Sequence, residues 1–330
     1  MKNDAVSQIC KKILESKRIV ITSHLRPDGD SICTSLALSF MGELLGKETA
    51  IINEENTPFP FCDFPDAERI KIGQIYPKEF DAVILLECAN VSRSGQKKLD
   101  GYFKLNVDHH HSNDFYADIN WVDPEASAVG EMAYFLGERL KIQFTPRTAN
   151  HLYAAIVSDT GSFQFSNTSA RAFDVCHRLI NLGANPTRVS EMLFNNNPPE
   201  KIKLLGQVLS TLQMNENRNI AVITMFKEFL DALRLKEIDT EDITTLARSI
   251  KSVEMVLFFK QVKNNSFRIS LRSKGRANAA AVAEHFGGGG HIHAAGFTVN
   301  GNYEELIREV PHKVEELIKE IERRGKNEKK

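Results

Sequence analysis

The first 182 residues alternate short apolar runs with longer segments of helical periodicity, and this alternation restricts the fold more than any other feature. We expect buried strands at the apolar runs, residues 18–22, 48–53, 81–86 and 104–107. We expect helices at the amphipathic segments, residues 1–16, 32–45, 127–140, 146–157 and 169–182. Strands that alternate with helices predict an α/β fold with a mainly parallel sheet and helices on both faces. Asp30 or Ser31 is the expected N-cap of the second helix.

The sequence changes character at residues 184–200, where clustered Asn and Pro residues are typical of a connection. We therefore expect an N-terminal domain over residues 1–198 and a linker helix over residues 199–214. Residues 215–330 are expected to form a smaller α/β domain. Its strands are expected at residues 219–225, 253–261 and 266–272, and its last helix at residues 303–324.

Composition excludes several classes of protein. With 330 residues, 42% of them hydrophobic, the chain can form two ordinary domains, and it has no apolar run long enough to span a membrane. The charged N-terminus has no signal-peptide core, so we expect a cytoplasmic protein. The five cysteines include no CxxC pair, which argues against a disulfide framework and a cysteine zinc site. The net charge of -1 favours a small anionic ligand over a long nucleic acid.

Four polar segments each follow an apolar run in the N-terminal part, at residues 24–30, 87–90, 108–111 and 158–162. In parallel sheets, ligands bind where the strands end, so we expect these segments to meet at one edge. Asp28 and Asp30 would point the same way on an extended backbone. Each segment alone is also typical of an ordinary turn.

Together the segments would bring four carboxylates, and a formal charge of about -4, into one site, where they would repel one another. Two divalent cations would cancel that charge, which favours metal binding over a carboxylate acid/base pair. A mixed set of imidazoles and carboxylates fits Mn2+ best, with Mg2+, Co2+ or Fe2+ as alternatives. A metal pair can bind a phosphoryl group and activate water for attack on it. The carboxylates are Asp28, Asp30, Glu87 and Asp159.

A second polar group lies in the C-terminal part. Residues 270–274, SLRSK, close a predicted strand, and residues 287–291, GGGGH, follow a predicted helix at residues 278–286. Consecutive glycines let backbone N–H groups approach an anion, and Arg272 and His291 could add charge-assisted bonds. The alternative is a helix C-cap followed by a flexible loop.

These segments, in this order, resemble the DHH phosphoesterase family, in the branch of nanoRNase/pAp phosphatases related to the RecJ exonucleases. SHLRPDGDS resembles the family's first motif, DHHH contains the motif that gives the family its name, and SDTGSF resembles the fourth. GGGGHIHAAG is similar to the signature of the DHH-associated C-terminal domain, DHHA1. The resemblance covers nearly the whole chain.

The resemblance implies a role for each matching residue. His24 and Asp28 would hold one metal ion, and Asp30, His109 and Asp159 would hold or share the other. Glu87 would bridge them, at a position where the family usually has Asp, and Asn90 stands where a second acidic residue is common. Asp108 and His110 would be catalytic, with His110 facing the substrate phosphate. The implied substrate-binding residues are Arg93, Arg272, Ser273, Gly288, Gly289, Gly290 and His291.

The expected activity is therefore metal-dependent hydrolysis of short oligoribonucleotides, of 3′-phosphoadenosine 5′-phosphate to AMP, or of both, by activated water. A cleft between the domains would limit substrate length, and a homodimer is compatible with the sequence. A cyclic or linear dinucleotide phosphodiesterase would use the same site. A family II pyrophosphatase would share the metal motifs but not the glycine-rich segment. A nucleotide-binding protein without turnover is the alternative from another class.

Overall fold

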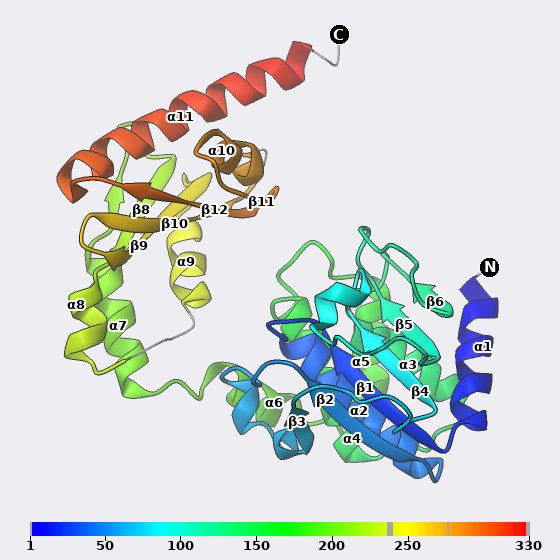
Figure 1. The fold of residues 1–330 in the computed structure, drawn as a ribbon. Helices are drawn as coiled ribbons and strands as arrows, with labels where there is room; N and C mark the ends of the chain where they lie inside the picture. The colour runs from blue at the N-terminus through cyan, green and yellow to red at the C-terminus, as the bar shows by residue number, and fades with distance from the viewer. Residues whose placement is uncertain (1, 236–239, 276, 328–330) are drawn as a thin grey trace. The chain divides into compact units, whose positions relative to one another are not determined.

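The computed structural model describes residues 2–235, 240–275 and 277–327, and the chain divides into two compact units between residues 196 and 197. The first unit contains a six-stranded sheet in the order β3-β2-β1-β4-β5-β6, with every neighbouring pair parallel (Figure 1). Its strands are β1 (Arg18–Ser23), β2 (Glu48–Asn53), β3 (Ile70–Ile72), β4 (Ala82–Leu86), β5 (Lys104–Asp108) and β6 (Ile119–Val122). The predicted α/β fold with a parallel sheet is confirmed.

The strand order places a topological switch between β1 and β4. From β1 the chain builds outward to β2 and β3, and then returns to place β4 on the other side of β1. Connections therefore leave the carboxyl ends of these two neighbouring strands in opposite directions. Ligands of open α/β sheets bind at such a point.

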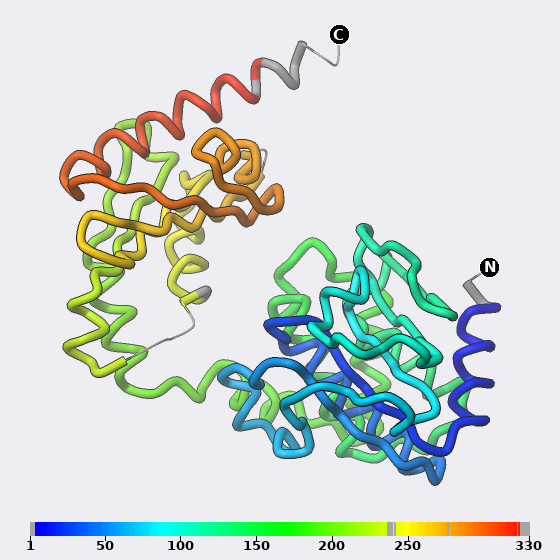
Figure 2. The backbone as a smooth tube through the Cα atoms, viewed as in Figure 1, coloured from blue at the N-terminus to red at the C-terminus, as the bar shows by residue number. Residues whose placement is uncertain are grey.

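One face of this sheet is covered by α-helices, which share one large core with the side chains of alternate strand positions. The trace in Figure 2 passes through all six strands in blue and cyan and then enters the green helices, so most of this layer is added after the sheet. The helices of the unit are α1 (Lys2–Glu15), α2 (Gly29–Leu44), α3 (Val129–Arg139), α4 (Pro146–Asp159), α5 (Ala170–Asn181) and α6 (Pro186–Phe194).

The other face has a smaller core, which includes Val20, Val83 and Leu85 from the strands. The 3-10 helix η3 (Val91–Ser94) and loop residues such as Leu99 cover it. Two further 3-10 helices, η1 (Phe61–Asp63) and η2 (Ala67–Arg69), lie between β2 and β3.

Several local expectations were wrong. The N-cap of α2 is Asp28, not Asp30 or Ser31, because the Asp28 carboxylate accepts from Ser31 N and the Ser31 hydroxyl accepts from Asp28 N in a capping box. Asp30 therefore lies in the first helical turn and not on extended backbone beside Asp28. Residues 184–200 are not simply a connection, because Asn185 caps the helix α6. The short strands β3 and β6 were not expected.

The second unit contains another six-stranded sheet, in the order β11-β12-β10-β9-β8-β7, in which only the pair β8 and β9 is parallel. Its strands are β7 (Gln213–Met214), β8 (Ile220–Met225), β9 (Met255–Lys263), β10 (Ser266–Ser273), β11 (Gly289–His291) and β12 (Ala294–Asn300). Its helices are α7 (Pro199–Ser210), α8 (Lys227–Ala232), α9 (Glu241–Arg248), α10 (Ala279–His285) and α11 (Tyr303–Asn327).

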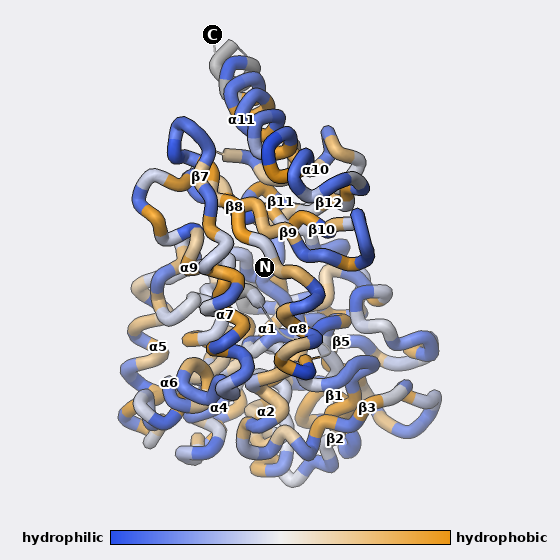
Figure 3. The backbone as a smooth tube through the Cα atoms, turned by 90° about the vertical axis from the view of Figure 1, so that its left-hand side faces the viewer, coloured by the Kyte–Doolittle hydropathy of each residue, from blue (hydrophilic) through white to orange (hydrophobic). Residues whose placement is uncertain are grey.

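The helices of the second unit cover both faces of its sheet. Leu204 and Val208 of α7 are buried with Ala221 and Ile223 of β8, so the expected linker helix packs as part of this unit. Figure 3 shows hydrophilic and hydrophobic colour alternating along α11, whose apolar side, including Val314, packs on the opposite face. Among the described helices, none combines the length and the apolarity that a bilayer-spanning segment needs.

Candidate metal centre

Three neighbouring strands of the first sheet end in side chains that can bind a metal. His24 follows β1, Glu87 follows β4, and His109 follows β5, and these strands are adjacent and parallel. Their carboxyl ends therefore bring the three side chains to one edge of the sheet. Glu87 has a left-handed backbone conformation with φ 55°. This conformation is uncommon for residues other than glycine, and residues that adopt it are often found at functional sites.

Two helices bring carboxylates to the same edge. Asp28 and Asp30 lie at the start of α2, and Asp159 is the last residue of α4. These helix ends pack closely, because a Cβ at Gly29 would lie 2.2 Å from the hydroxyl oxygen of Ser158. Glycine at position 29 therefore allows the start of α2 to approach the end of α4.

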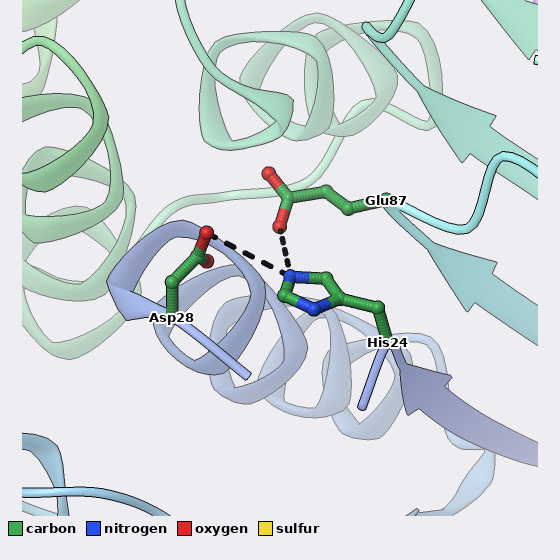
Figure 4. Close-up of side chains that lie close together, drawn as sticks. All are labelled: His24, Asp28 and Glu87. Atoms are coloured by element: carbon green, nitrogen blue, oxygen red, sulfur yellow. Dashed lines mark ion pairs between the residues drawn. The ribbon is translucent and has the colours of Figure 1, made fainter. Parts of the chain in front are cut away.

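His24, Asp28 and Glu87 form a first group, in which one ligand atom from each lies within 4.8 Å of the others. His24 Nε2 is 3.4 Å from Glu87 Oε2 and 3.7 Å from Asp28 Oδ2, as the dashed lines in Figure 4 mark. The three side chains point toward one another from a strand end, a helix start and a second strand end (Figure 4).

Asp30, Glu87 and His109 form a second group within the same 4.8 Å limit. His109 Nε2 is 3.7 Å from Glu87 Oε1 and 3.9 Å from Asp159 Oδ2. Glu87 is common to both groups and uses a different oxygen toward each histidine. This arrangement is that of a carboxylate between two sites.

Both histidines have their ring orientation fixed by a backbone carbonyl. His24 Nδ1 donates to Leu25 O at 2.8 Å, and His109 Nδ1 donates to Ala126 O at 3.0 Å. A proton on Nδ1 leaves the lone pair of Nε2 directed at the carboxylates. Histidines that bind metals are typically held in this way.

The carboxylates of the site repel one another. Burial raises the pKa of Glu87 well above its usual range, and the charges of Asp28 and Asp30 raise it further. Burial, together with the charge of Asp30, raises the pKa of Asp159 to about 7. Burial alone would lower the pKa of His109, but the charges of Asp30 and Asp159 outweigh it and raise that pKa.

These residues fit divalent cations. Glu87 is 1% exposed, and its Oε2 makes no hydrogen bond with any described residue. A buried carboxylate oxygen without a donor is costly unless a cation binds it. The mixed oxygen and imidazole donors suit Mn2+ or another transition metal better than Ca2+.

Asp30 has a second task that the sequence did not reveal. Its carboxylate accepts hydrogen bonds from Val129 N and from Gly130 N, the latter at 2.8 Å, and these are the first N–H groups of α3. The Thr34 hydroxyl donates to the same carboxylate at 2.9 Å. Because Ala128 offers no side-chain cap, Asp30 caps α3 from a distant part of the chain.

Asp108 holds His110 at the rim of the site. Asp108 is fully buried, and its Oδ1 accepts from His110 Nδ1 at 2.7 Å and from His110 N at 3.0 Å. Its Oδ2 accepts from Asn113 Nδ2 at 2.5 Å. The His110 side chain remains 46% exposed, so its Nε2 can reach a ligand.

The remaining residues expected near this edge lie around it. Arg93 is exposed in η3, and its charge acts on His24. Asn90 caps η3 by accepting from Arg93 N at 3.2 Å, so it has a local structural role. His111 is exposed beyond His110.

In the second unit, Arg272 and His291 lie on one face of the sheet. Both are paired with Ala294, Arg272 across β10–β12 and His291 across β11–β12. Directly paired residues project to the same face, so Arg272 and His291 flank Ala294 on one face, with their backbones about 10 Å apart.

The other predicted residues of this unit have structural tasks. Gly289 and Gly290 belong to β11, and a Cβ at Gly288 would lie 2.2 Å from Gly296 O. Close approach of β12 thus accounts for part of the glycine run. Ser273 is 1% exposed, and its hydroxyl donates to Ala277 O at 2.7 Å, which holds the loop before α10.

Sequence reasoning missed three polar residues that hold the site together. Thr34 bonds Asp30, Asn113 bonds Asp108, and Asn167 bonds Asp159, with Asn167 Nδ2 3.0 Å from Asp159 Oδ2. The one available signal was for Thr34, which lies four residues after Asp30 and therefore on the same side of a helix. Nothing in the local sequence of the two asparagines indicates their partners.

Comparisons with known proteins identify the families that the two parts of the chain match. Residues 18–156 match the model of the DHH family, N-terminal domain, and residues 229–325 match the model of the DHHA1 domain. The bifunctional oligoribonuclease and PAP phosphatase NrnA of Thermus thermophilus is 29% identical over 283 residues, which cover 86% of this chain and 84% of that protein.

Solved structures share the fold. A crystal structure of an exopolyphosphatase-related protein from Bacteroides fragilis superposes with a TM-score of 0.85 at 24% identity, covering 94% of this chain and 95% of the other. RecJ of Thermus thermophilus, crystallised in complex with Mn2+, has a TM-score of 0.52 at 15% identity, covering 97% of this chain and 55% of RecJ.

Proposed function

The chain belongs to the DHH family and carries a DHHA1 domain, and on this premise we propose that it hydrolyses phosphate esters of short nucleotides with two divalent cations. The observation that carries the proposal is the convergence on Glu87 of two histidines whose Nε2 atoms face inward. We propose Mn2+ as the metal, because the donor set mixes imidazole with carboxylate. The similarly folded RecJ was crystallised with this ion.

We assign the metal ligands by the two groups. His24 and Asp28 would hold one cation, Asp30, His109 and Asp159 the other, and Glu87 would lie between them. When bound, the cations supply positive charge for the phosphate and a water of lowered pKa. The four carboxylates then change from mutually repelling groups into a counter-charge for the metals.

The proposed substrates are short oligoribonucleotides and 3′-phosphoadenosine 5′-phosphate, since the relative named for both activities is similar over most of this chain. Water would add its oxygen to phosphorus, the ester P–O bond would break, and the leaving oxygen would take a proton. His110 would bind the phosphate, and the 46% exposure of its side chain supports this role. Asp108 accepts from His110 Nδ1 and thereby fixes the orientation of the His110 ring.

In the second unit, we propose that Arg272 and His291 bind an anionic part of the substrate. Support comes from the pairing of both residues with Ala294, which places them on one sheet face. Arg272 would contribute a planar guanidinium suited to phosphate.

The test is turnover of metal-free protein after addition of Mn2+ or Mg2+, with 3′-phosphoadenosine 5′-phosphate, a diribonucleotide, a long single-stranded RNA and pyrophosphate as substrates. We expect hydrolysis of the first two, loss with a chelator, and recovery with Mn2+. Asp159→Ala should abolish turnover, whereas the exposed Asp100→Ala should not change it. Tight nucleotide binding without turnover, under any metal, would instead establish a non-catalytic binding protein.

A further inference from the structure

The end of α4 is an unfavourable position for the charged carboxylate of Asp159. Asp159 is the last residue of α4, where the partial negative charge of the helix end opposes a carboxylate. Its side chain is 25% exposed and has His109, 3.9 Å away, as its ion-pair partner. Among the described residues, Asn167 gives the one hydrogen bond that this carboxylate accepts.

The side-chain amide of Asn167 bonds both the carboxylate and the backbone carbonyl of Asp159. Its Nδ2 donates to Asp159 Oδ2 at 3.0 Å, to Asp159 O at 3.1 Å and to Ser127 O at 3.0 Å. The amide thus ties the carboxylate to the backbone of its own residue and to the segment before α3. With two hydrogens shared among three acceptors, the orientation of this amide is fixed.

Ser127 fixes Asn167 in turn. Ser127 is fully buried, and its hydroxyl donates to Asn167 O at 2.6 Å and contacts the hydroxyl of Ser169, the N-cap of α5, at 2.9 Å. Its backbone N–H donates to the buried Glu131 at 3.2 Å, and Arg171 pairs with Glu131. The support for Asp159 therefore reaches through buried polar groups to α3 and α5.

The loop that carries Asn167 keeps an unusual backbone. Gly161, Ser162 and Phe163 all have positive φ values, of 54°, 58° and 64°. For the two residues other than glycine such a conformation costs free energy and persists only where its surroundings enforce it. The bond from Phe165 N to Thr160 O, at 3.0 Å, closes this turn directly after Asp159.

We propose that Asn167 is a positioning residue that orients the Asp159 carboxylate toward a divalent cation, with Ser127 as its support. The inference rests on the proposed metal centre and adds a residue that holds one of its ligands. Groups that orient a metal ligand commonly change metal affinity by about 10- to 100-fold when they are removed. A purely structural role would change the stability of the metal-free protein and leave metal affinity unaltered.

The experiment titrates the full chain with Mn2+ alone and follows the free ion by electron paramagnetic resonance. We expect two bound ions in the wild type, and Asn167→Ala should weaken one of them by about 10-fold or more. Asn181→Ala is the matched control, because Asn181 is exposed on α5 and contacts His177. Its Mn2+ affinities should equal those of the wild type.

Two further variants keep the inference testable if Asn167→Ala does not fold. Asn167→Leu keeps a similar side-chain size, cannot donate and adds no charge, so wild-type or higher Mn2+ affinity would overturn the role of the donated bond. Ser127→Ala should weaken the same ion to a smaller extent. If the wild type binds two ions and every variant binds them equally, the positioning role fails alone. If the wild type binds none, the proposed metal centre fails with it.

Discussion

Asp30 and Asp159 are both proposed metal ligands, but the structure predicts that only Asp30 stabilises the metal-free fold. The Asp30 carboxylate accepts from Val129 N and Gly130 N at the start of α3, and from the buried Thr34 hydroxyl. Loss of an N-cap costs about 1–2 kcal/mol, and a buried hydroxyl left without its partner costs about 1 kcal/mol more. Asp30→Ala should therefore destabilise the metal-free first unit by about 2–3 kcal/mol.

Asp159→Ala leaves no comparable buried group without a hydrogen-bond partner. The Asn167 amide that bonds its carboxylate keeps its bonds to Asp159 O and Ser127 O. The change also removes a carboxyl group whose pKa burial and the charge of Asp30 raise to about 7. We therefore expect the free energy of unfolding to change by no more than about 0.5 kcal/mol.

The measurement is thermal unfolding of the full chain in a chelator, followed by the fluorescence of Trp121. This residue is the one tryptophan of the sequence and lies buried, 6% exposed, in β6 of the first unit. For a unit of about this size, 1 kcal/mol shifts the midpoint by about 2–4 °C, so Asp30→Ala should lower it by roughly 4–12 °C. Equal midpoints for the two variants would refute the assignment of Asp30 as the distant cap of α3.

Three other variants test separate parts of the molecule. Asp108→Asn should lower kcat with little change in KM, because it disturbs the orientation of His110 but not the metal ligands. Steady-state kinetics on 3′-phosphoadenosine 5′-phosphate would measure both constants, and a change in KM alone would contradict this role. Arg272→Ala should mainly raise KM, as the loss of a binding contact that is not a metal ligand would, and a loss confined to kcat would count against that role. Asp81 accepts hydrogen bonds from Lys17 N and Arg18 N, and these bonds lower its pKa in the folded protein. The stability that Asp81 contributes is therefore present above its unfolded pKa of about 4 and is lost as pH falls through the lower folded pKa. Asp81→Asn should therefore flatten the decline in melting temperature below about pH 4, and an unchanged decline would show that these bonds do not contribute.

The sequence indicated the edge of the sheet where the candidate site lies, because that placement follows from strand direction alone. His24, Glu87 and His109 each follow an apolar run, and parallel strands bring their carboxyl ends together. Asp159 could be predicted for another reason. It ends a helix and not a strand, but the resemblance of SDTGSF to the family motif identified it. The metal assignment rests on charge repulsion, which is the second cause of the raised pKa of Glu87: burial raises it most, and the charges of Asp28 and Asp30 raise it further.

Other features depended on contacts between distant segments, which local patterns do not contain. The asparagines and prolines of residues 184–200 are typical of a connection, yet Asn185 is the N-cap of α6. The asparagine signal was real, but a cap and a turn use the same residue types. The glycines at 288–290 predict an anion site, and the structure shows that close approach of β12 requires small residues at Gly288 and Gly290.

In the candidate site, the side chains proposed to bind cations also affect the stability of the first unit. Burial raises the pKa of Glu87, and burial with the charge of Asp30 raises that of Asp159, so without cations these carboxyl groups retain protons more readily than exposed ones. A cation that binds them must displace those protons, which makes metal binding dependent on pH. Because cations would relieve the repulsion among the four carboxylates at this sheet edge, the proposed metals would stabilise the first unit. The bonds from α3 to Asp30 and from Asn167 to Asp159 would hold these proposed ligands in place before cations bind.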